Sequence, residues 1–330
     1  MNPPKNQSTV LITGCSSGFG QATAELFLAR GWNVIATMRS PQFDRFEASE
    51  RLLITALDVT DAQSVSAAIA AGIARFGGID AFVNNAGIGL FGAHEAVSDD
   101  VIRQVFETNT FGVMAANRAI IPHLRERGAG TIINVTSSAG IAPMPLVAAY
   151  TASKYAIEGF SESLAYELAL FGIRVKIVEP GFSPTTRFTF NSGERCNNTL
   201  PTAYVEHAGR YMKSMQTYPT AYTTAQDVAE TVFEAATDDR DQLRYPAGAD
   251  SQMLAQLRRS LPEHEFIARI RAMTGSDLSV SMHANTKLVS SARWVVRFRD
   301  ASRRVRVCIP RRREPATWAA KLLGLLLVQF

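Results

Sequence analysis

The chain has 330 residues, of which 46% are hydrophobic and 19% are charged. This composition excludes a disordered, collagen-like or coiled-coil protein, and the length allows a large buried core. Cys15, Cys196 and Cys308 lie far apart, so they predict neither a disulfide framework nor a close metal cluster, and a reducing cytoplasm is the expected location. We expect no signal peptide in residues 1–9 and no membrane span, because no run of 18 apolar residues occurs.

The net charge of +4 is unevenly distributed along the chain. Residues 276–330 hold 11 Lys or Arg and 3 Asp or Glu, a net charge of +8, whereas residues 1–275 have a net charge of −4. Since the basic excess belongs to the C-terminal tail, the rest of the chain gives no electrostatic reason to expect nucleic acid.

Short apolar segments alternate with helical patterns over the first 250 residues. The segments predict strands that are apolar throughout, as expected for a sheet covered on both faces: Thr9–Thr13, Asn33–Thr37, Leu52–Leu57, Ala81–Asn84, Thr131–Val135, Arg174–Val178 and a weaker one near Leu243–Tyr245. Helices are predicted near residues 18–30, 61–76, 99–126, 150–171 and 225–237. This alternation predicts right-handed βαβ crossovers and an α/β fold with one doubly wound parallel sheet of about seven strands.

The pattern is interrupted twice. Residues 182–224 lack a predicted strand, and an insertion there would lie over the carboxyl edge of the sheet, where ligands bind in such folds. After Gly275 the composition becomes Ser-rich, then Arg-rich, then apolar. We predict one domain over 1–275 and a basic, disordered tail over 276–330. Two alternatives stay open for the tail, namely contact with an anionic membrane, ranked well below disorder, and an artefact of translation or of the gene model.

A glycine-rich turn follows the first predicted strand directly. It reads Thr13-Gly14-Cys15-Ser16-Ser17-Gly18-Phe19-Gly20 and leads into a helix. Glycines permit positive φ and let a pyrophosphate approach the backbone at a helix N-terminus. A tight turn without a ligand is the alternative, because the spacing differs from the common G-x-G-x-x-G.

Five further motifs follow this turn in a fixed order: Asn84-Asn85-Ala86-Gly87, Asn109 in NTFG, Ser137 in INVTSSAG, Tyr150-Thr151-Ala152-Ser153-Lys154, and Pro180-Gly181 with Thr185. Together they resemble the short-chain dehydrogenase/reductase family, and the segment Tyr150–Leu168 resembles its 17β-hydroxysteroid and retinol dehydrogenase-like branch. The resemblance covers residues 9–185 strongly, continues weakly to about Gly275 and implies a Rossmann-type fold. It implies an enzyme that transfers hydride between a nicotinamide dinucleotide and a CH–OH or carbonyl group.

The resemblance implies four catalytic residues, Ser137, Tyr150, Lys154 and Asn109. Tyr150 and Lys154 share one helix face, and a lysine ammonium together with a positive nicotinamide would lower the pKa of the phenol for acid–base work. Ser137, favoured over Ser138 because it lies 13 residues before the tyrosine, would bind the substrate oxygen. Asn109 would place a water that connects Lys154 to solvent.

The resemblance also implies cofactor contacts from the turns at the strand ends: Thr13, Gly14, Ser16, Ser17, Gly18, Phe19, Gly20, Asp58, Val59, Asn85, Ala86, Gly87, Tyr150, Lys154, Pro180, Gly181 and Thr185. Asp58 has a simpler interpretation as a turn residue. NAD-preferring members of the family carry an Asp where this chain has Met38. The guanidinium of Arg39 can instead bind a 2′-phosphate through two charge-assisted hydrogen bonds. We therefore predict NADP, with NAD as the alternative, unless Arg39 is only a solvated charge.

Apolar residues that could line a substrate pocket predict a lipophilic alcohol or ketone, although each could equally belong to the core: Gly89, Leu90, Phe91, Ala139, Pro143, Met144, Val147, Phe182, Phe188 and Phe190. The five histidines show no metal-binding spacing, so we predict no metal. The family commonly pairs through two long helices, which predicts a homodimer or homotetramer through 99–126 and 150–171. A non-catalytic dinucleotide-binding sensor or scaffold is the alternative function, and an epimerase or dehydratase ranks lower.

Overall fold

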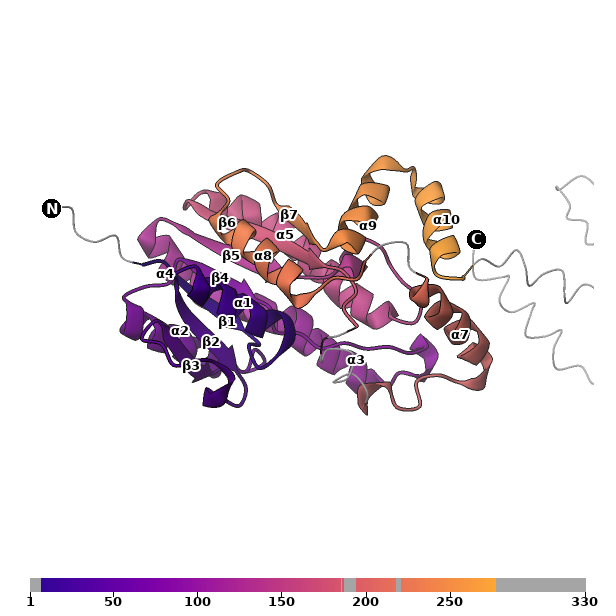
Figure 1. Ribbon diagram of the computed structural model, residues 1–330, viewed down its shortest axis with the longest axis horizontal. Helices are drawn as coiled ribbons and strands as arrows, with labels where there is room; N and C mark the ends of the chain where they lie inside the picture. The colour runs from indigo at the N-terminus through magenta and orange to yellow at the C-terminus, as the bar shows by residue number, and fades with distance from the viewer. Residues whose placement is uncertain (1–6, 185, 187–193, 218–220, 277–330) are drawn as a thin grey trace, which may run out of the picture. The chain divides into compact units, whose positions relative to one another are not determined.

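The computed structural model describes residues 7–184, 186, 194–217 and 221–276. Their centre is a parallel sheet in the order β3-β2-β1-β4-β5-β6-β7 (Figure 1). The strands span β1 Thr9–Thr13, β2 Asn33–Met38, β3 Leu52–Ala56, β4 Ala81–Asn84, β5 Gly130–Val135, β6 Ile173–Pro180 and β7 Arg244–Ala247. The α/β fold with a seven-stranded Rossmann-type sheet is thereby confirmed. The order reverses between β1 and β4, which opens a crevice at the carboxyl edge.

Helices cover both faces of the sheet (Figure 1). On one face lie α1 (Gly18–Ala29) and α8 (Ala225–Thr237), and on the other α2 (Ala62–Phe76), α4 (Gly112–Arg127) and α5 (Ala148–Ala169). Each face has its own apolar core, and the strand residues that face them, such as Leu11 and Ile12, are fully buried. Burial on both faces explains why the strands are apolar throughout.

The helix predicted over 99–126 is divided into three parts. The first is α3 (Asp99–Phe106), the second is the π-helical segment η3 (Glu107–Phe111), and the third is α4. The segment holds Asn109, whose side chain bonds the backbone of Ile88 across the edge of the sheet. Sequence periodicity cannot reveal such a segment, because it depends on this contact with another part of the chain.

Three helices were not predicted: α7 (Thr202–Gln216), α9 (Ala249–Ser260) and α10 (Glu263–Met273). The latter two bury Leu254, Phe266 and Ile270 in a separate small core, which also includes Ala142 from the loop after β5. Their apolar residues are few, so tertiary packing rather than an evident stripe stabilises them.

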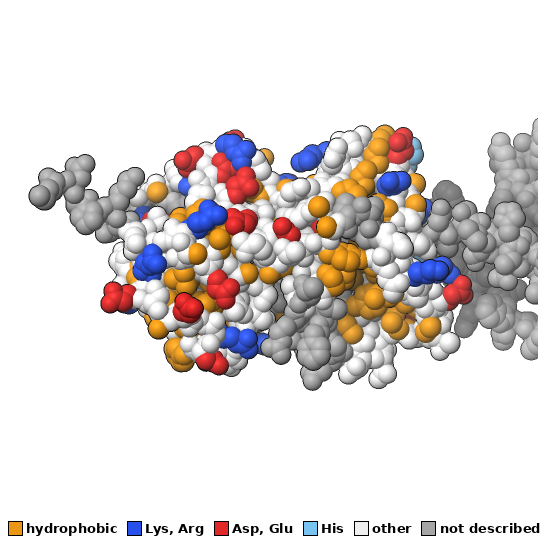
Figure 2. Space-filling model, viewed as in Figure 1, with side chains coloured by type: hydrophobic (Ala, Val, Ile, Leu, Met, Phe, Trp, Pro, Cys, Tyr) orange, Lys and Arg blue, Asp and Glu red, His pale blue; other side chains and the backbone are white. Residues whose placement is uncertain are grey.

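The predicted tail falls outside the described residues, except for its first residue, Ser276. Among the described helices, none is long and apolar enough to cross a membrane. Basic and acidic side chains are interspersed on the face of the sheet domain seen in Figure 2.

Candidate active site

The turn between β1 and α1 is shaped by glycines with little space around them. Gly14 has φ +77°, and a Cβ there would lie 2.9 Å from the Cα of Ala86. A Cβ at Gly20 would overlap the carbonyl oxygen of Gly14. Gly18 also has positive φ, at +60°, but its missing Cβ faces more open space, with Thr186 the nearest neighbour at 3.7 Å. Only glycine satisfies these positions without strain.

Side chains from β1 and β4 hold this turn in place. The amides of Asn85 and Ala86 both donate to the Thr13 hydroxyl at 3.0 Å. The Asn85 side chain donates to the carbonyl oxygens of Thr13, at 2.8 Å, and Gly14, at 3.3 Å. Thr13, Asn85 and Ala86, which are predicted as cofactor contacts, therefore also have a structural role, because their hydrogen bonds fix the shape of the turn.

The residues of the turn fit a dinucleotide. Ser17 is the N-cap of α1, and its side chain makes no capping hydrogen bond, so the first backbone N–H groups of α1 keep no described side-chain partner. Such a helix start attracts a pyrophosphate. Ser16 and Ser17 are half-buried beside it, while Phe19 packs against the core. Arg39 follows the neighbouring strand, since β2 ends at Met38. Because Thr37 of β2 pairs with Thr13 of β1, Arg39 comes at the same edge of the sheet as the glycine turn.

Two further residues predicted as cofactor contacts, Asp58 and Val59, also have structural roles. One oxygen of Asp58 accepts hydrogen bonds from the amide and hydroxyl of Thr60, at 2.9 and 2.8 Å. Val59 is buried against Gly112 of α4. The simpler interpretation of Asp58 as a turn residue therefore holds, and its contact with a cofactor stays a prediction.

Ser137 and Tyr150 meet at the carboxyl end of β5. Ser137 is the N-cap of the short turn η4 (Ser138–Gly140), and its hydroxyl accepts from the amide of Ala139 at 3.1 Å. Tyr150 lies in the first turn of α5, packs beside Leu90 and is hydrogen bonded to Ser137. Burial raises the pKa of the Tyr150 phenol to about 12, and the bond to Ser137 opposes this rise.

Lys154 lies one turn after Tyr150 on α5, with its ammonium nitrogen 5.8 Å from the centroid of the phenol ring. It is buried and donates to the carbonyl oxygen of Val135 at 3.2 Å. Burial lowers its pKa to about 8, so Lys154 is partly uncharged at neutral to mildly alkaline pH. In the polypeptide by itself, loss of solvation therefore raises the pKa of Tyr150. The predicted lowering needs the positive nicotinamide as well as the lysine charge, and it stays a prediction.

Asn109 is buried between the loop after β4 and α5. Its amide group bonds the backbone of Ile88 in both directions and donates to the Ser153 hydroxyl at 3.2 Å. A Cβ at Gly87 would lie 3.3 Å from the Asn109 oxygen and 3.7 Å from the Lys154 nitrogen. Gly87 thus lies between Asn109 and Lys154, and the four residues predicted as catalytic come together at one edge of the sheet.

The loop after β6 is held by a residue that sequence reasoning missed, Asp250 of α9. Its buried carboxylate accepts from the amide of Phe182 at 2.7 Å and from the Thr223 hydroxyl, and a side chain at Gly181 would overlap it. Pro180 ends β6. Thr185 lies outside the described residues. The segment RYPAGAD contains Asp250, but nothing in its spacing indicates this contact 68 residues away.

Aromatic side chains lie in the loops that follow β4 and β6 at the carboxyl edge of the sheet. Phe91 stacks on Tyr211 of α7, with centroids 6.3 Å apart, and Phe182 meets Tyr222 edge to face at 5.3 Å. Leu90 is core rather than lining, whereas Phe182 is 37% exposed. Phe188 and Phe190 lie outside the described residues. Among the residues that the structure describes, no group of three potential metal ligands occurs.

The fold and this edge of the sheet define a doubly wound α/β protein in which a half-buried serine and a half-buried tyrosine lie beside a buried lysine. The family model described as short chain dehydrogenase matches residues 8–195. The chain belongs to the short-chain dehydrogenase/reductase family, whose members act on a CH–OH or carbonyl group with a nicotinamide dinucleotide. The predicted family and enzyme class are thereby confirmed.

Relatives of known sequence agree with this assignment. The chain is 35% identical over 267 residues to the uncharacterized oxidoreductase YusZ of Bacillus subtilis, covering 78% of this chain and 95% of that protein. It is 35% identical over 272 residues to human retinol dehydrogenase 5, covering 76% of this chain and 84% of that protein.

Solved structures include a short-chain dehydrogenase/reductase of Burkholderia phymatum in complex with NAD, with TM-score 0.65 and 25% identity over 80% of this chain and 95% of that chain. Another is a short-chain dehydrogenase of Burkholderia cenocepacia in complex with NADP, with TM-score 0.64 and 25% identity over 80% of this chain and 98% of that chain. These neighbours support use of a nicotinamide dinucleotide as cofactor.

Proposed function

We propose that this enzyme interconverts a lipophilic alcohol and the corresponding ketone or aldehyde with NADP(H), using Tyr150 as acid–base. The observation that carries the proposal is the enclosed phenol, bonded to Ser137 and one helical turn from Lys154. Retinol dehydrogenase 5 is named for a lipophilic alcohol and covers most of this chain, which supports the same substrate class. The aromatic side chains in the loops after β4 and β6, Phe91 and Phe182, also favour an apolar substrate.

The chain's own residues supply orientation and proton transfer. In carbonyl reduction, the Ser137 hydroxyl donates a hydrogen bond to the substrate oxygen and Tyr150 donates its phenolic proton to the same oxygen. In alcohol oxidation Tyr150 accepts that proton. The bound dinucleotide supplies the hydride donor or acceptor. Lys154 stabilises the phenolate when charged. Asn109, which like Lys154 lies next to Gly87, is proposed to place a water that exchanges the proton with solvent.

A substrate panel tests the proposed class. All-trans-retinal, a 17-ketosteroid, an aromatic ketone and a charged 2-oxo acid are incubated with NADPH, and the absorbance of the reduced nicotinamide is followed. We expect turnover of at least one lipophilic carbonyl and none of the 2-oxo acid. Preference for the charged acid would contradict the apolar substrate class.

Arg39 is proposed to select NADP over NAD. It directly follows β2, is exposed and forms no ion pair with any described residue, so its guanidinium is available to a 2′-phosphate. We expect Arg39→Glu to lower kcat/KM for NADPH by about 10- to 100-fold, because one charge-assisted bidentate contact is replaced by repulsion. The value for NADH should change little. Arg45→Glu changes a half-buried arginine that is bonded to Gln42 and serves as the control. Equal losses with both dinucleotides would exclude Arg39 as the selector.

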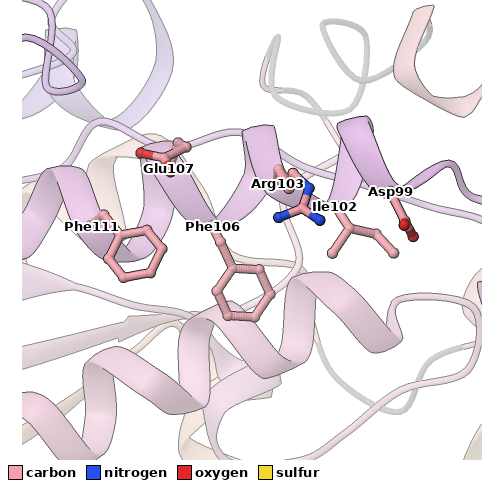
Figure 3. Close-up of a pocket in the computed structure, with 6 residues that line it drawn as sticks. All are labelled: Asp99, Ile102, Arg103, Phe106, Glu107 and Phe111. Atoms are coloured by element: carbon pink, nitrogen blue, oxygen red, sulfur yellow. The ribbon is translucent and has the colours of Figure 1, made fainter.

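Assembly through the long helices is proposed from their exposed apolar residues. Phe111 on η3 is 53% exposed and Leu170, at the end of α5, is 82% exposed. Phe106 and Phe111 line a surface pocket of about 360 Å³ along α3 and η3. Figure 3 shows that both rings project from the same side of these helical segments. Apolar surface of this kind is typical of subunit interfaces. Cytoplasmic location and any role of the tail stay predictions.

Charges placed at these two exposed apolar residues should separate the subunits. We expect Phe111→Glu combined with Leu170→Glu to yield monomers in analytical ultracentrifugation, whereas the unchanged protein sediments as a dimer or tetramer. Burying two unpaired carboxylates costs several kcal/mol, enough to prevent association at micromolar concentration. Met212→Glu on α7, also at an exposed apolar residue, is the control. A monomeric unchanged protein would contradict the proposed assembly.

A further inference from the structure

Glu158, a buried carboxylate that the reaction does not use, lies next to the catalytic residues. Glu158 follows Lys154 by one turn on α5, and its side chain is 6% exposed. A Cβ at Gly140 would lie 3.0 Å from both the Cγ and the Oε1 of Glu158. Since Gly140 ends η4, the turn that begins at Ser137, the glutamate stem packs against the turn that carries the catalytic serine.

An arginine on the far side holds this carboxylate. Arg244 of β7 donates at 2.9 Å to the Oε2 of Glu158 and at 2.9 Å to Glu162, and it lies 3.4 Å from the Oε1 of Glu179 on β6. The second oxygen of Glu158, Oε1, has no hydrogen-bond partner among the described residues. Burying a carboxylate with an unbonded oxygen lowers the stability of the fold. We therefore interpret Glu158 as a residue whose negative charge has a function.

The charges that face Glu158 come from every element around it. Burial raises its pKa, and the hydroxyl of Thr136, directly after β5, and Arg244 of β7 oppose this rise. Burial and the charge of Glu158 raise the pKa of Glu179 to about 8, and Arg244 and Arg259 of α9 oppose this rise. On α5, Glu162 raises the pKa of Glu158. Two further neighbours lie on α5. Burial and the charge of Glu158 raise the pKa of Tyr155, against the effect of Arg258 of α9, and the other neighbour is Lys154 itself.

We propose that Glu158 is a positioning residue of the active site: its carboxylate, held by Arg244, is the buried counter-charge of Lys154, and its stem supports the Ser137–Gly140 turn. A negative charge one helical turn from a buried ammonium stabilises the charged form. Lys154 already loses solvation, with a pKa lowered to about 8, and Glu158 is the group that opposes this loss. Without it, Lys154 would be uncharged over more of the physiological pH range.

This inference rests on the proposed role of Lys154, but its test needs no turnover. The chain has six lysines, so a full-length protein labelled with ¹³C at lysine Cε gives few NMR signals, and Lys154→Met assigns one of them. The pH midpoint of that signal is measured in the unchanged protein, in Glu158→Gln and in Glu162→Gln. Glu162 also bonds Arg244 at 2.9 Å but is 51% exposed, which makes it the matched control.

We expect Glu158→Gln to lower the midpoint of Lys154 by about 1 pH unit, because removal of a nearby opposite charge disfavours the ammonium. Glu162→Gln should leave the midpoint in place, and Glu158→Asp, which keeps the charge, should restore most of it. An unchanged midpoint in Glu158→Gln, or equal shifts in the two glutamine variants, would overturn the proposal. A purely structural role would reduce thermal stability without moving the Lys154 midpoint in the folded variant.

Should Glu158→Gln fail to fold, Thr136→Val gives a second test. It removes the hydroxyl that opposes the rise of the Glu158 pKa, together with the hydrogen bond that this hydroxyl donates to the carbonyl oxygen of Val178 at 3.3 Å, while nearly keeping the side-chain volume. We expect a smaller shift of Lys154 in the same direction. A shift of the opposite sign would contradict the proposal. Turnover by Tyr150→Phe tests only the proposed function, whereas the Lys154 midpoint tests only the role of Glu158. Failure of the proposed function can therefore be told apart from failure of this inference.

Discussion

The Tyr150→Phe variant is expected to lose about 10³-fold in kcat, equivalent to roughly 4 kcal/mol of transition-state stabilisation. The change removes the hydroxyl that bonds Ser137 and lies one helical turn from Lys154. Dinucleotide affinity should be nearly unchanged, because the ring and the glycine turn stay in place. Turnover is measured with the best carbonyl of the panel, and binding of NADPH by calorimetry.

A second tyrosine on the same helix serves as the control. Tyr155 donates to the carbonyl oxygen of Ile141 at 3.3 Å and is 38% exposed, so Tyr155→Phe removes a hydroxyl of the same kind outside the catalytic edge. We expect its kcat to stay near that of the unchanged protein. Full turnover by Tyr150→Phe would exclude the acid–base assignment, whatever the control shows.

Gly14→Ala is expected to have the largest effect on dinucleotide binding. The added Cβ would meet the Cα of Ala86 at 2.9 Å, and the residue would have to keep φ +77°. A left-handed non-glycine residue costs about 1–2 kcal/mol, and the contact with backbone forces the turn to move. We therefore expect dinucleotide affinity to fall at least about 10-fold, or about 1.4 kcal/mol, as measured by calorimetry.

The Gly77→Ala variant is the control that distinguishes the effect of backbone strain from the effect of steric crowding around the new Cβ. It has φ +81° at the end of α2, but a Cβ there would meet nothing within 4 Å. Gly77→Ala should lower the free energy of unfolding by about 1–2 kcal/mol and leave dinucleotide affinity unchanged. If Gly14→Ala bound NADPH as tightly as Gly77→Ala does, the turn between β1 and α1 would not be the pyrophosphate site.

Local pattern was sufficient to predict most of the fold. The first six strands agree with their predicted ranges to within two residues at each end, and the weak seventh was found at Arg244–Ala247. These strands are buried on both faces, so their continuous apolar runs are visible without tertiary information. The glycine turn and the Tyr150–Lys154 pair were likewise predictable, since their spacing along the chain is what places them together on a turn or on one helix face.

Features that depend on distant residues could be decided only by the tertiary structure. Asp250 meets Phe182 across 68 residues, and Arg244 meets Glu158 across 86. The pKa directions of Tyr150 and Lys154 follow from burial, and burial of a side chain is a property of the packed fold, not of its neighbours in sequence. Local periodicity and spacing therefore determined which elements and reactive groups exist, whereas long-range packing decided how solvation and charge tune them.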